Sequence, residues 1–347
     1  MKGIILAAGK GTRMLPLSRR HPKPLIPFLD RPMIEHIITG AAGAGVDELV
    51  IVVGHRGQDI VDHLGAEGAG VRLHYVWQEE ARGTGDALLL AEPFVRAEPF
   101  FLSWGDIMVP PHNYRRLADL WRGRQPTVCL TVNRVEDPYE GAAVYLEEDR
   151  VARIVEKPAR GTSATPYNNA GIFMVAPALL EALHRTPVSA RGELEVPDAI
   201  QLLLQEGADV RGLPIEGYWS DVARPATVLA LNSEALRYLY PQSDVVCGAE
   251  ANVARDAVLH RPCLVADGAT VEAGATVGAG TCILRGARVG AGARVANSLL
   301  MQRSTVGERA EVEWAIVDEG EAVPSGAEVA GSSTEPIIVM DEGSRGG

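Results

Sequence analysis

Hydrophobic residues in the first two thirds of the chain form short runs separated by stretches with helical spacing. The runs predict buried strands at residues 4–7, 48–53, 73–77, 100–104 and 127–132. Stretches of helical spacing lie between them, at residues 33–42, 58–64, 84–90 and 114–121. This alternation predicts an α/β domain over residues 1–240, with a Rossmann-like, mostly parallel sheet and helices on both faces. Ligands of such sheets bind beyond the carboxyl ends of the strands.

After Pro241 the hydrophobic period becomes six. This period does not fit an α-helix, and it predicts a parallel β-helix of hexapeptide repeats over residues 241–335, with the aliphatic residue of each repeat in the core. A tail over residues 336–347 follows, with a short strand at residues 336–340. The phase slips by one residue after the unbroken series and again after Val312. The series is Val253, Leu259, Val265, Val271, Val277, Ile283, Val289, Val295 and Met301.

Charge is unevenly distributed along this acidic chain. The formal net charge of −12 argues against general nucleic-acid binding. The first 29 residues nevertheless carry six Lys and Arg and no Asp or Glu. Either they form a pocket for an anionic ligand or they are a chance cluster on a solvated loop. Only four of the 33 cationic side chains are Lys, so Lys23 and Lys157 stand out as compact ammonium groups suited to phosphate.

The remaining composition points to a cytoplasmic protein without a membrane partner. No apolar run is long enough to span a membrane, and residues 1–8 are typical of a strand, not of a secretory signal. The four cysteines lack the CxxC spacing, so the sequence indicates neither a zinc site nor a disulfide framework.

The first chemical motif follows the first predicted strand. It reads Leu-Ala-Ala-Gly-Lys-Gly-Thr-Arg-Met from Leu6 to Met14, and Pro-Lys-Pro follows at residues 22–24. Glycines after a strand allow backbone N–H groups to approach a phosphate. The string lacks the spacing of a Walker A loop, and Met14 stands where a dinucleotide fingerprint needs its third Gly.

This string resembles the beginning of the sugar-1-phosphate nucleotidylyltransferases, and Arg31 to His36 continue the likeness. It is most similar to members that act on N-acetylglucosamine 1-phosphate with UTP, or on glucose 1-phosphate with dTTP. The resemblance implies that Arg13 and Lys23 contact the triphosphate and the sugar phosphate. It also implies a nucleotide-binding set from this motif of Leu6, Ala8, Gly9, Gly11, Thr12 and Arg13.

A second motif runs from Gln78 to Leu88. A Gln amide offers a donor and an acceptor for the edge of a base. The resemblance assigns Gln78, Gly83 and Thr84 to the nucleotide base. The alternative is a structural glycine turn with Thr84 as the N-cap of the following helix.

Two carboxylates match the family's magnesium ligands. Asp106 follows the strand at residues 100–104, and Asp221 lies in a Trp-Ser-Asp-Val segment in which Ala223 replaces the usual Gly. Magnesium prefers hard oxygen ligands and is often bound by one or two carboxylates together with substrate phosphates. The resemblance therefore implies Mg²⁺ as the cofactor.

A further group matches the family's sugar-phosphate site in order and spacing. The resemblance implies that Glu156 and Asn169 hold sugar groups, that Gly141 approaches the sugar with its backbone, and that Lys157 neutralises the sugar phosphate. The alternative for Glu156 and Lys157 is an exposed charge pair of little energetic weight. Together, the implied catalytic residues are Arg13, Lys23, Asp106 and Lys157.

The resemblance implies an enzyme that takes a nucleoside triphosphate and a sugar 1-phosphate and releases pyrophosphate. It also implies a left-handed β-helix, through which chains assemble into a homo-oligomer. Some members acetylate glucosamine 1-phosphate in that part. Here it holds only His260 and no Lys, which favours the assembly role. A mannose-1-phosphate guanylyltransferase and a non-catalytic regulatory subunit of the same layout remain alternatives, although the retained charged residues speak against the latter.

Overall fold

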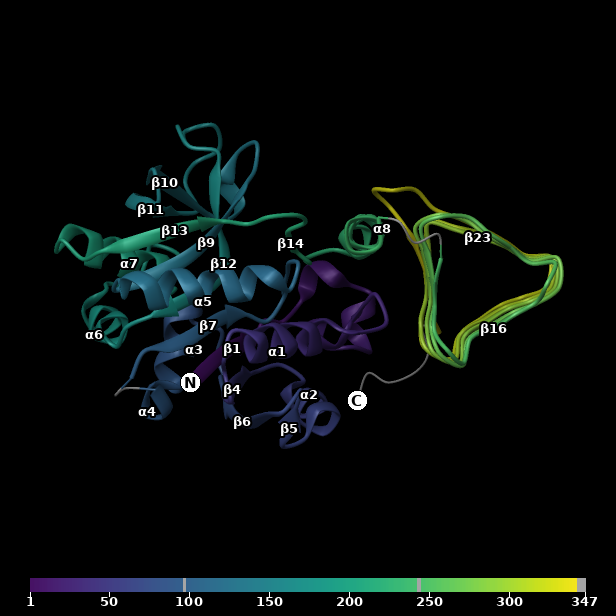
Figure 1. Ribbon diagram of the computed structural model, residues 1–347, viewed down its shortest axis with the longest axis horizontal. Coiled ribbons are helices and arrows are strands. Elements are labelled where there is room, and N and C mark those ends of the chain that lie inside the picture. Colours follow the sequence, from purple (N-terminus) through teal and green to yellow (C-terminus); the bar gives the residue numbers. More distant parts are fainter. Residues whose placement is uncertain (96–97, 242–244, 342–347) are drawn as a thin grey trace. The chain divides into compact units, whose positions relative to one another are not determined.

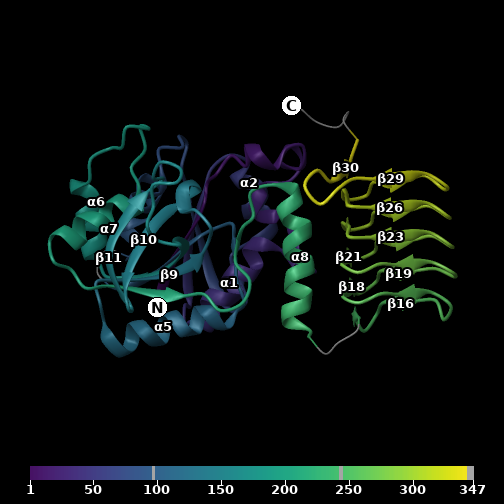
Figure 2. The same ribbon diagram turned by 90° about the horizontal axis from the view of Figure 1, so that it is seen from above.

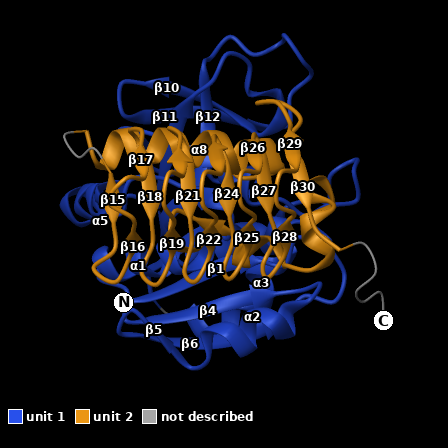
Figure 3. Cartoon of the chain, turned by 90° about the vertical axis from the view of Figure 1, so that its right-hand side faces the viewer, with its two compact units in different colours: residues 1–10, 33–221 blue, residues 11–32, 222–347 orange. Residues whose placement is uncertain are grey.

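A computed structural model describes residues 1–95, 98–241 and 245–341. The chain forms two compact units, coloured separately in Figure 3. Unit 1 consists of Met1–Lys10 and Met33–Asp221, and unit 2 joins Gly11–Pro32 to the chain from Val222 onward. The glycine-rich motif is thus divided between the two units. The boundaries expected from the sequence at residues 240 and 335 remain a prediction.

Unit 1 is built on a ten-stranded sheet with the order β10-β11-β13-β9-β12-β7-β1-β4-β6-β5. Its centre, β7-β1-β4-β6, is parallel throughout. This confirms the predicted Rossmann-like core. The strands are β1 (Lys2–Ala7), β4 (Glu48–Val53), β5 (Glu67–Gly68), β6 (Val71–Trp77), β7 (Phe100–Trp104), β9 (Val128–Arg134), β10 (Ala142–Glu147), β11 (Arg150–Glu156), β12 (Tyr167–Val175) and β13 (Val210–Pro214).

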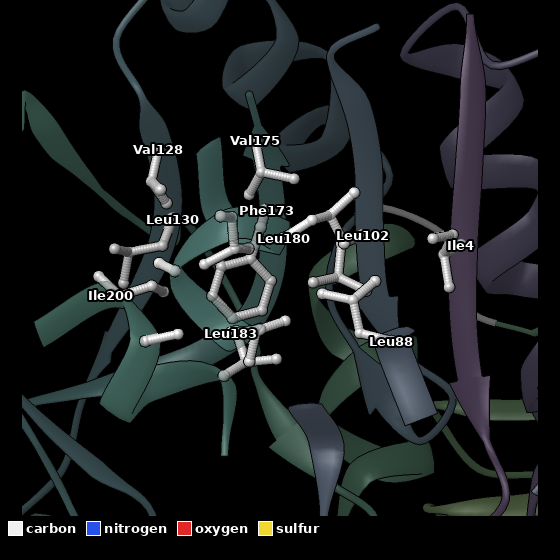
Figure 4. Close-up of a cluster of buried hydrophobic side chains, with 14 of the residues drawn as sticks. Ile4, Leu88, Leu102, Val128, Leu130, Phe173, Val175, Leu180, Leu183 and Ile200 are labelled. Atoms are coloured by element: carbon white, nitrogen blue, oxygen red, sulfur yellow. The ribbon is translucent and has the colours of Figure 1, made fainter. Parts of the chain in front are cut away.

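Helices cover both faces of this sheet, as strand β7 illustrates. Phe100 packs in a cluster with side chains of the helices after β6 and β12, while the ring centroid of Phe101 lies 6.1 Å from that of Tyr114 on the other face. Figure 4 shows part of that cluster, with Leu102 of β7 beside Leu88 and Phe173. Neighbouring strand residues point to opposite faces, so a strand buried on both sides is apolar throughout. The helices are α1 (Met33–Gly43), α2 (Gly57–Leu64), α3 (Thr84–Leu90), α4 (Glu92–Val95), α5 (His112–Arg124), α6 (Ala178–Arg185) and α7 (Val196–Gln205).

The five predicted strands and four predicted helices of this unit are confirmed to within a few residues. Sequence did not reveal the antiparallel part, in which β12 runs between β7 and β9 and β10 pairs with β11. A short two-stranded sheet of β8 (Ile107–Met108) and β14 (Ser220–Asp221) completes the unit.

Unit 2 contains three parallel sheets that form a triangular solenoid, as the view along its axis shows (Figure 1). All strands of these sheets pair in parallel, which is consistent with the expected left-handed β-helix of hexapeptide repeats. Helix α8 (Pro225–Leu239) lies along one sheet and contacts β18 and β21 (Figure 2). The strands are β15 (Val246–Cys247), β16 (Asn252–Val253), β17 (Val258–Leu259), β18 (Cys263–Val265), β19 (Thr270–Val271), β20 (Thr276–Val277), β21 (Thr281–Ile283), β22 (Arg288–Val289), β23 (Arg294–Ala296), β24 (Leu299–Leu300), β25 (Thr305–Val306), β26 (Glu311–Glu313), β27 (Ala315–Val317), β28 (Ala322–Val323), β29 (Glu328–Ala330) and β30 (Ile337–Val339).

One hexad position differs from the prediction. Ile283 pairs with Leu300, so Leu300 and not Met301 occupies the core position of its coil. The phase slip therefore precedes this residue, at a corner where Asn297 adopts a positive φ of 49°. The second slip falls at Trp314, also with φ of 49°, before Val317. Most other corners have Gly in that backbone conformation, which Gly adopts without steric cost.

The last predicted strand is confirmed as β30, but it belongs to the β-helix and not to a loose tail. It pairs in parallel with β27 and closes the last coil of that sheet. The remainder of the predicted tail, residues 342–347, lies outside the described residues. Within the described part of the chain, the helices are all too short or too polar to cross a membrane.

The segment of residues 11–32 forms three 3-10 turns, η1 (Thr12–Met14), η2 (Leu17–Arg19) and η3 (Lys23–Leu25), and a hairpin of β2 (Pro27–Phe28) and β3 (Arg31–Pro32). We call this segment the signature loop. It has apolar side chains of its own that are almost fully buried. These are Met14, Leu17, Ile26, Phe28 and Leu29.

Removing the central aromatic side chain of the unit 1 core should destabilise this unit. Phe173 is fully buried in the cluster shown in Figure 4, so Phe173→Ala should cost about 3–5 kcal/mol of unfolding free energy. Val188→Ala, at a 63%-exposed side chain, is the control and should change it by less than about 0.5 kcal/mol. Urea titration followed by tryptophan fluorescence measures both, because four of the five Trp residues lie in unit 1. Equal losses in the two variants would contradict this account of the core.

Candidate functional site

The carboxyl ends of the four parallel central strands bring the motifs of unit 1 to one edge. Leu6 pairs with Val52 on one side and with Trp104 on the other. The Leu6 carbonyl accepts a hydrogen bond from the N–H of Gly105 (2.8 Å), and the N–H of Gln78 donates to the Val53 carbonyl (2.8 Å). The segments that carry Leu6, Gln78 and Asp106 therefore leave the sheet side by side, where ligands of such folds bind.

The first motif contributes residues to both units. Leu6, Ala8 and Gly9 belong to unit 1, whereas Gly11, Thr12, Arg13 and Lys23 belong to unit 2. Gly11 has a φ of +62°, and a Cβ there would lie 3.3 Å from the Cβ of Lys23. The glycine thus permits the turn and lets the chain pass close to Lys23.

Gln78 is held by its amide nitrogen. Nε2 donates to the Asp86 Oδ2 (2.8 Å) and to the Gly83 carbonyl (3.3 Å), and the residue is only 8% exposed. Asp86 also receives Arg82 Nη2 at 3.1 Å. Because both neighbours are acceptors, they fix which end of the amide faces them. In the described part of the chain, the Gln78 Oε1 has no hydrogen-bond partner.

Thr84 does not cap its own helix. The N-cap of α3 is Gly83, without a side-chain hydrogen bond. The Thr84 hydroxyl instead accepts from the N–H of Val196 (3.0 Å), the first residue of α7, and donates to Glu195 (2.9 Å). The alternative in which Thr84 caps its own helix is therefore wrong. The hydroxyl instead binds a backbone N–H at the start of α7, which has no partner within that helix.

Close packing against the segment before α7 also requires glycine at position 83. A Cβ there would lie 2.3 Å from the Leu194 carbonyl, at a φ of +102°. Backbone hydrogen bonds from Leu194 to Arg82 (2.9 Å) and from Gly85 to Leu194 (2.8 Å) fasten the two segments together. The segment expected to contact the base is thus joined to the acidic segment before α7.

Of the two candidate metal ligands, Asp221 lies in the small sheet of β8 and β14, and Asp106 immediately precedes β8. Asp221 pairs across the strands with Ile107, the neighbour of Asp106. The Trp219 indole N–H donates to the Ala170 carbonyl (3.0 Å), which fixes the approach of this segment to β12. In the described residues no cluster of three or more His, Cys, Asp or Glu could hold a metal. A pair of carboxylates still fits magnesium, which completes its shell with water and substrate phosphate oxygens.

The structure brings together the four residues expected at the sugar phosphate. Ala142, next to Gly141, pairs with Glu156, and Ala143 pairs with Asn168, next to Asn169. The Lys157 N–H donates to the Gly141 carbonyl (2.7 Å). A Cβ on Gly141 would lie 2.2 Å from the Oδ1 of Asn168, so this position has a structural reason to be Gly.

Lys157 lies among carboxylates. Its Nζ is 3.7 Å from Glu193 and 3.8 Å from both Glu156 and Glu195. Burial raises the pKa of Glu156 to about 7, repulsion from Glu195 adds to this, and attraction to Lys157 opposes it. Burial also raises the pKa of Glu195. The alternative of an exposed charge pair is thus wrong for Glu156, whose side chain is 11% exposed.

Sequence reasoning missed several residues around these motifs. Glu193 and Glu195 surround Lys157, and Asp86 orients Gln78. No local pattern marked these residues, because their partners become neighbours only after folding.

The comparisons with known proteins agree with this geometry. The family profile described as "Nucleotidyl transferase" matches residues 2–237, and that described as "GMPPB C-terminal domain" matches residues 259–341. The "Bifunctional protein GlmU" of Methanocaldococcus jannaschii is 34% identical over 328 residues, covering 93% of this chain and 75% of the relative. A "Glucose-1-phosphate thymidylyltransferase" of Streptomyces antibioticus is 27% identical over 345 residues, covering 99% and 88%.

Solved structures show the same fold. A UDP-glucose pyrophosphorylase complexed with UDP-glucose matches with a TM-score of 0.62 at 21% identity, over 70% of this chain and 99% of that chain. A putative glucose-1-phosphate thymidylyltransferase from Bacillus anthracis matches with a TM-score of 0.62 at 27% identity, over 67% and 94%.

The chain belongs to the nucleotidyl transferase family. It is an enzyme of the sugar-1-phosphate nucleotidyltransferase kind, which confirms the expected class. This membership of an enzyme class speaks against the alternative of a non-catalytic regulatory subunit.

Replacing the buried Glu156 should change how stability depends on pH. The pKa of about 7 lies above the ordinary value of 4.5, so the protonated carboxyl stabilises the fold at low pH, and this contribution is lost as pH rises through 7. The wild type should therefore lose about 3 kcal/mol of unfolding free energy between about pH 4 and about pH 8 through this group. Glu156→Gln lacks this loss, so the difference in unfolding free energy between variant and wild type should shift by that amount in favour of the variant. Urea titrations at a series of pH values measure this, and parallel curves for the two proteins would rule out the raised pKa.

Proposed function

We propose that this enzyme transfers a nucleoside monophosphate from UTP or dTTP to N-acetylglucosamine 1-phosphate or glucose 1-phosphate and releases pyrophosphate. The observation that carries the proposal is the link, within unit 1, between the turn after Gln78 and the expected sugar-phosphate residues: Thr84 donates to Glu195, whose carboxylate lies 3.8 Å from the Lys157 Nζ. A relative named glucose-1-phosphate thymidylyltransferase, aligned over 99% of this chain, supports the same reaction.

The fixed orientation of Gln78 supports a base that presents a hydrogen-bond donor, as uracil and thymine do with a ring N–H. Both hydrogens of its amide nitrogen are engaged by Gly83 and Asp86, so only the acceptor Oε1 remains to meet a ligand. The N3–H of uracil or thymine can donate to it. A nucleotide that supplies a donor gains a hydrogen bond to this oxygen.

Guanine is the second candidate base, on the same observation. Its N1–H is also a ring donor that can meet Oε1, so a guanylyltransferase acting on mannose 1-phosphate remains the alternative substrate pair.

The reaction needs no protein nucleophile. An oxygen of the sugar phosphate attacks the α-phosphorus in line, a new O–P bond forms, and the bond from the α-phosphorus to the pyrophosphate oxygen breaks. The protein positions the two anions and neutralises their charge, with Arg13 and Lys23 on the triphosphate and Lys157 on the sugar phosphate. Glu156 and Asn169 orient the sugar, and Gly141 meets it with its backbone.

Magnesium would be held by Asp106 and Asp221 together with phosphate oxygens. When bound, it supplies positive charge that lowers the repulsion between the two substrates. The position of Asp221 opposite the residue that follows Asp106 and the preference of magnesium for hard oxygen ligands support this assignment.

Assembly of chains through the β-helix is part of the same proposal. Val258 of β17 is 48% exposed, and the core residues of the first coils, Val253 and Leu259, are only half-buried. An apolar solenoid end of this kind gains stability when a second copy covers it.

The decisive experiment measures pyrophosphate release with magnesium over a grid of nucleotides and sugar phosphates. UTP, dTTP, GTP, CTP and ATP are each paired with glucose, N-acetylglucosamine and mannose 1-phosphates. Turnover with UTP or dTTP and one of the first two sugars supports the proposal, and turnover with GTP and mannose 1-phosphate supports the second candidate. Turnover with ATP or CTP alone would overturn the proposed substrates.

Removing either proposed metal ligand should abolish most of the activity. Asp106→Asn and Asp221→Asn keep the size of the side chain but remove a negative charge from the magnesium site. Each should lower kcat by on the order of 100-fold or more, and raise the magnesium concentration needed for half-maximal rate. Asp209→Asn, at an ion pair with Arg211 on β13, serves as the control. Unchanged magnesium dependence in both variants would remove this pair from the metal site.

A further inference from the structure

The signature loop is tied to a distant coil of the β-helix. His21 Nε2 lies 2.6 Å from the Asp318 Oδ1, and Arg20 Nη1 lies 3.0 Å from the Asp318 Oδ2 and 2.5 Å from Glu321. Nearly 300 residues separate the partners in sequence, and all four belong to unit 2.

Asp318 is built into the coil to make this contact. Its side chain is 0% exposed, and a buried carboxylate is costly unless it is paired. The N–H of Glu319 donates to its Oδ1 (2.8 Å), so the backbone also fixes its direction. Burial alone would raise the pKa of Asp318, but the hydrogen bond from His21 and the charge of Arg20 outweigh it and hold this pKa below its ordinary value.

A second contact ties the carboxyl-terminal part of the loop to α8. The N–H of Leu29 donates to the Asn232 Oδ1 (2.6 Å), and Asn232 is 1% exposed. Helix α8 in turn packs on the β-helix, where the hydroxyl of Ser233 lies next to Gly280. The loop is therefore held near its middle and near its carboxyl end by one body.

These anchors lie close in sequence to the cationic residues of the loop. Lys23 is two residues from His21, and its Cβ packs on Gly11, two residues before Arg13. Backbone hydrogen bonds join the turns without a long free stretch, from Met14 to Gly11 (2.9 Å), from His21 to Leu17 (3.0 Å) and from Ile26 to Lys23 (3.1 Å). A displacement of His21 is thus transmitted to the backbone of Lys23.

We propose that Asp318, with Glu321, is a positioning residue for nucleotide binding: the β-helix holds the signature loop in the conformation that presents Arg13 and Lys23 to the triphosphate. This rests on the proposed role of those two cations. Without the anchor the loop samples other conformations. The apparent affinity for the nucleotide then falls in proportion to the population of the binding-competent conformation.

The test compares Asp318→Asn with a matched change one residue away. Glu319→Gln also converts a carboxylate to an amide, but its partner Arg303 belongs to the β-helix itself. Asp318→Asn should raise amide hydrogen exchange in residues 12–31 of the signature loop, but not in the coils of the β-helix that do not contain Asp318. It should also weaken UTP–magnesium binding by calorimetry about tenfold, while the KM for the sugar 1-phosphate changes less than about twofold. Glu319→Gln should match the wild type in all three measurements.

A double-mutant cycle separates anchoring from general damage to the fold. His21→Phe removes the contact from the loop side and leaves the coil intact. If Asp318 acts through the loop, the double variant His21→Phe/Asp318→Asn should bind UTP little worse than Asp318→Asn alone.

Additive losses, unchanged exchange in the loop, or faster exchange with unchanged UTP affinity would each overturn the proposal. Failure of the wild type to turn over any pair of the grid would instead count against the proposed function. The exchange measurement would still decide whether Asp318 holds the loop.

Discussion

The parallel pairing of β1 with β4 and β7 is the constraint on which the rest of unit 1 depends. Its register places Leu6 between Val52 and Trp104, so the chain leaves three neighbouring strands at the same level. The hydrogen bond from Gly105 to the Leu6 carbonyl extends this pairing by one residue and sets where Asp106 emerges. A shift of this register by one residue would turn the inward side chains of β1 toward the opposite face.

Around that edge, buried charge determines which distant segments must meet. The buried carboxylates of Glu156 and Glu195 need a cation near them, and Lys157 supplies it. Thr84 connects the segment before α7 to the turn that follows Gln78, through hydrogen bonds to Val196 and Glu195. The parts expected to contact the base and the sugar phosphate therefore share one hydrogen-bonded support, and neither is an independent loop on a rigid sheet.

Sequence predicted the elements whose periodicity is local. Strands such as Glu48–Val53 and helices such as Thr84–Leu90 matched because an apolar run or a helical face is visible within ten residues. The hexads predicted the β-helix but misplaced one core position, because Leu300 and Met301 are adjacent and both apolar. Nothing local marked Asp86, Glu195 or Asp318, whose partners become neighbours only after folding. The roles of the site residues stay predictions.

The place of Asp318 along the solenoid gives the β-helix a definite length. Solenoids tolerate the gain or loss of whole coils, since each coil contacts only its neighbours. Here α8 packs on the early strands β18 and β21, and the signature loop contacts both α8 and the coil of Asp318. Insertion of one coil between them would leave every hexad satisfied and move the carboxylate by about 4.8 Å along the axis. The contacts of the loop with both α8 and the coil of Asp318 therefore fix the number of coils between them. A solenoid without such a contact carries no constraint of this kind.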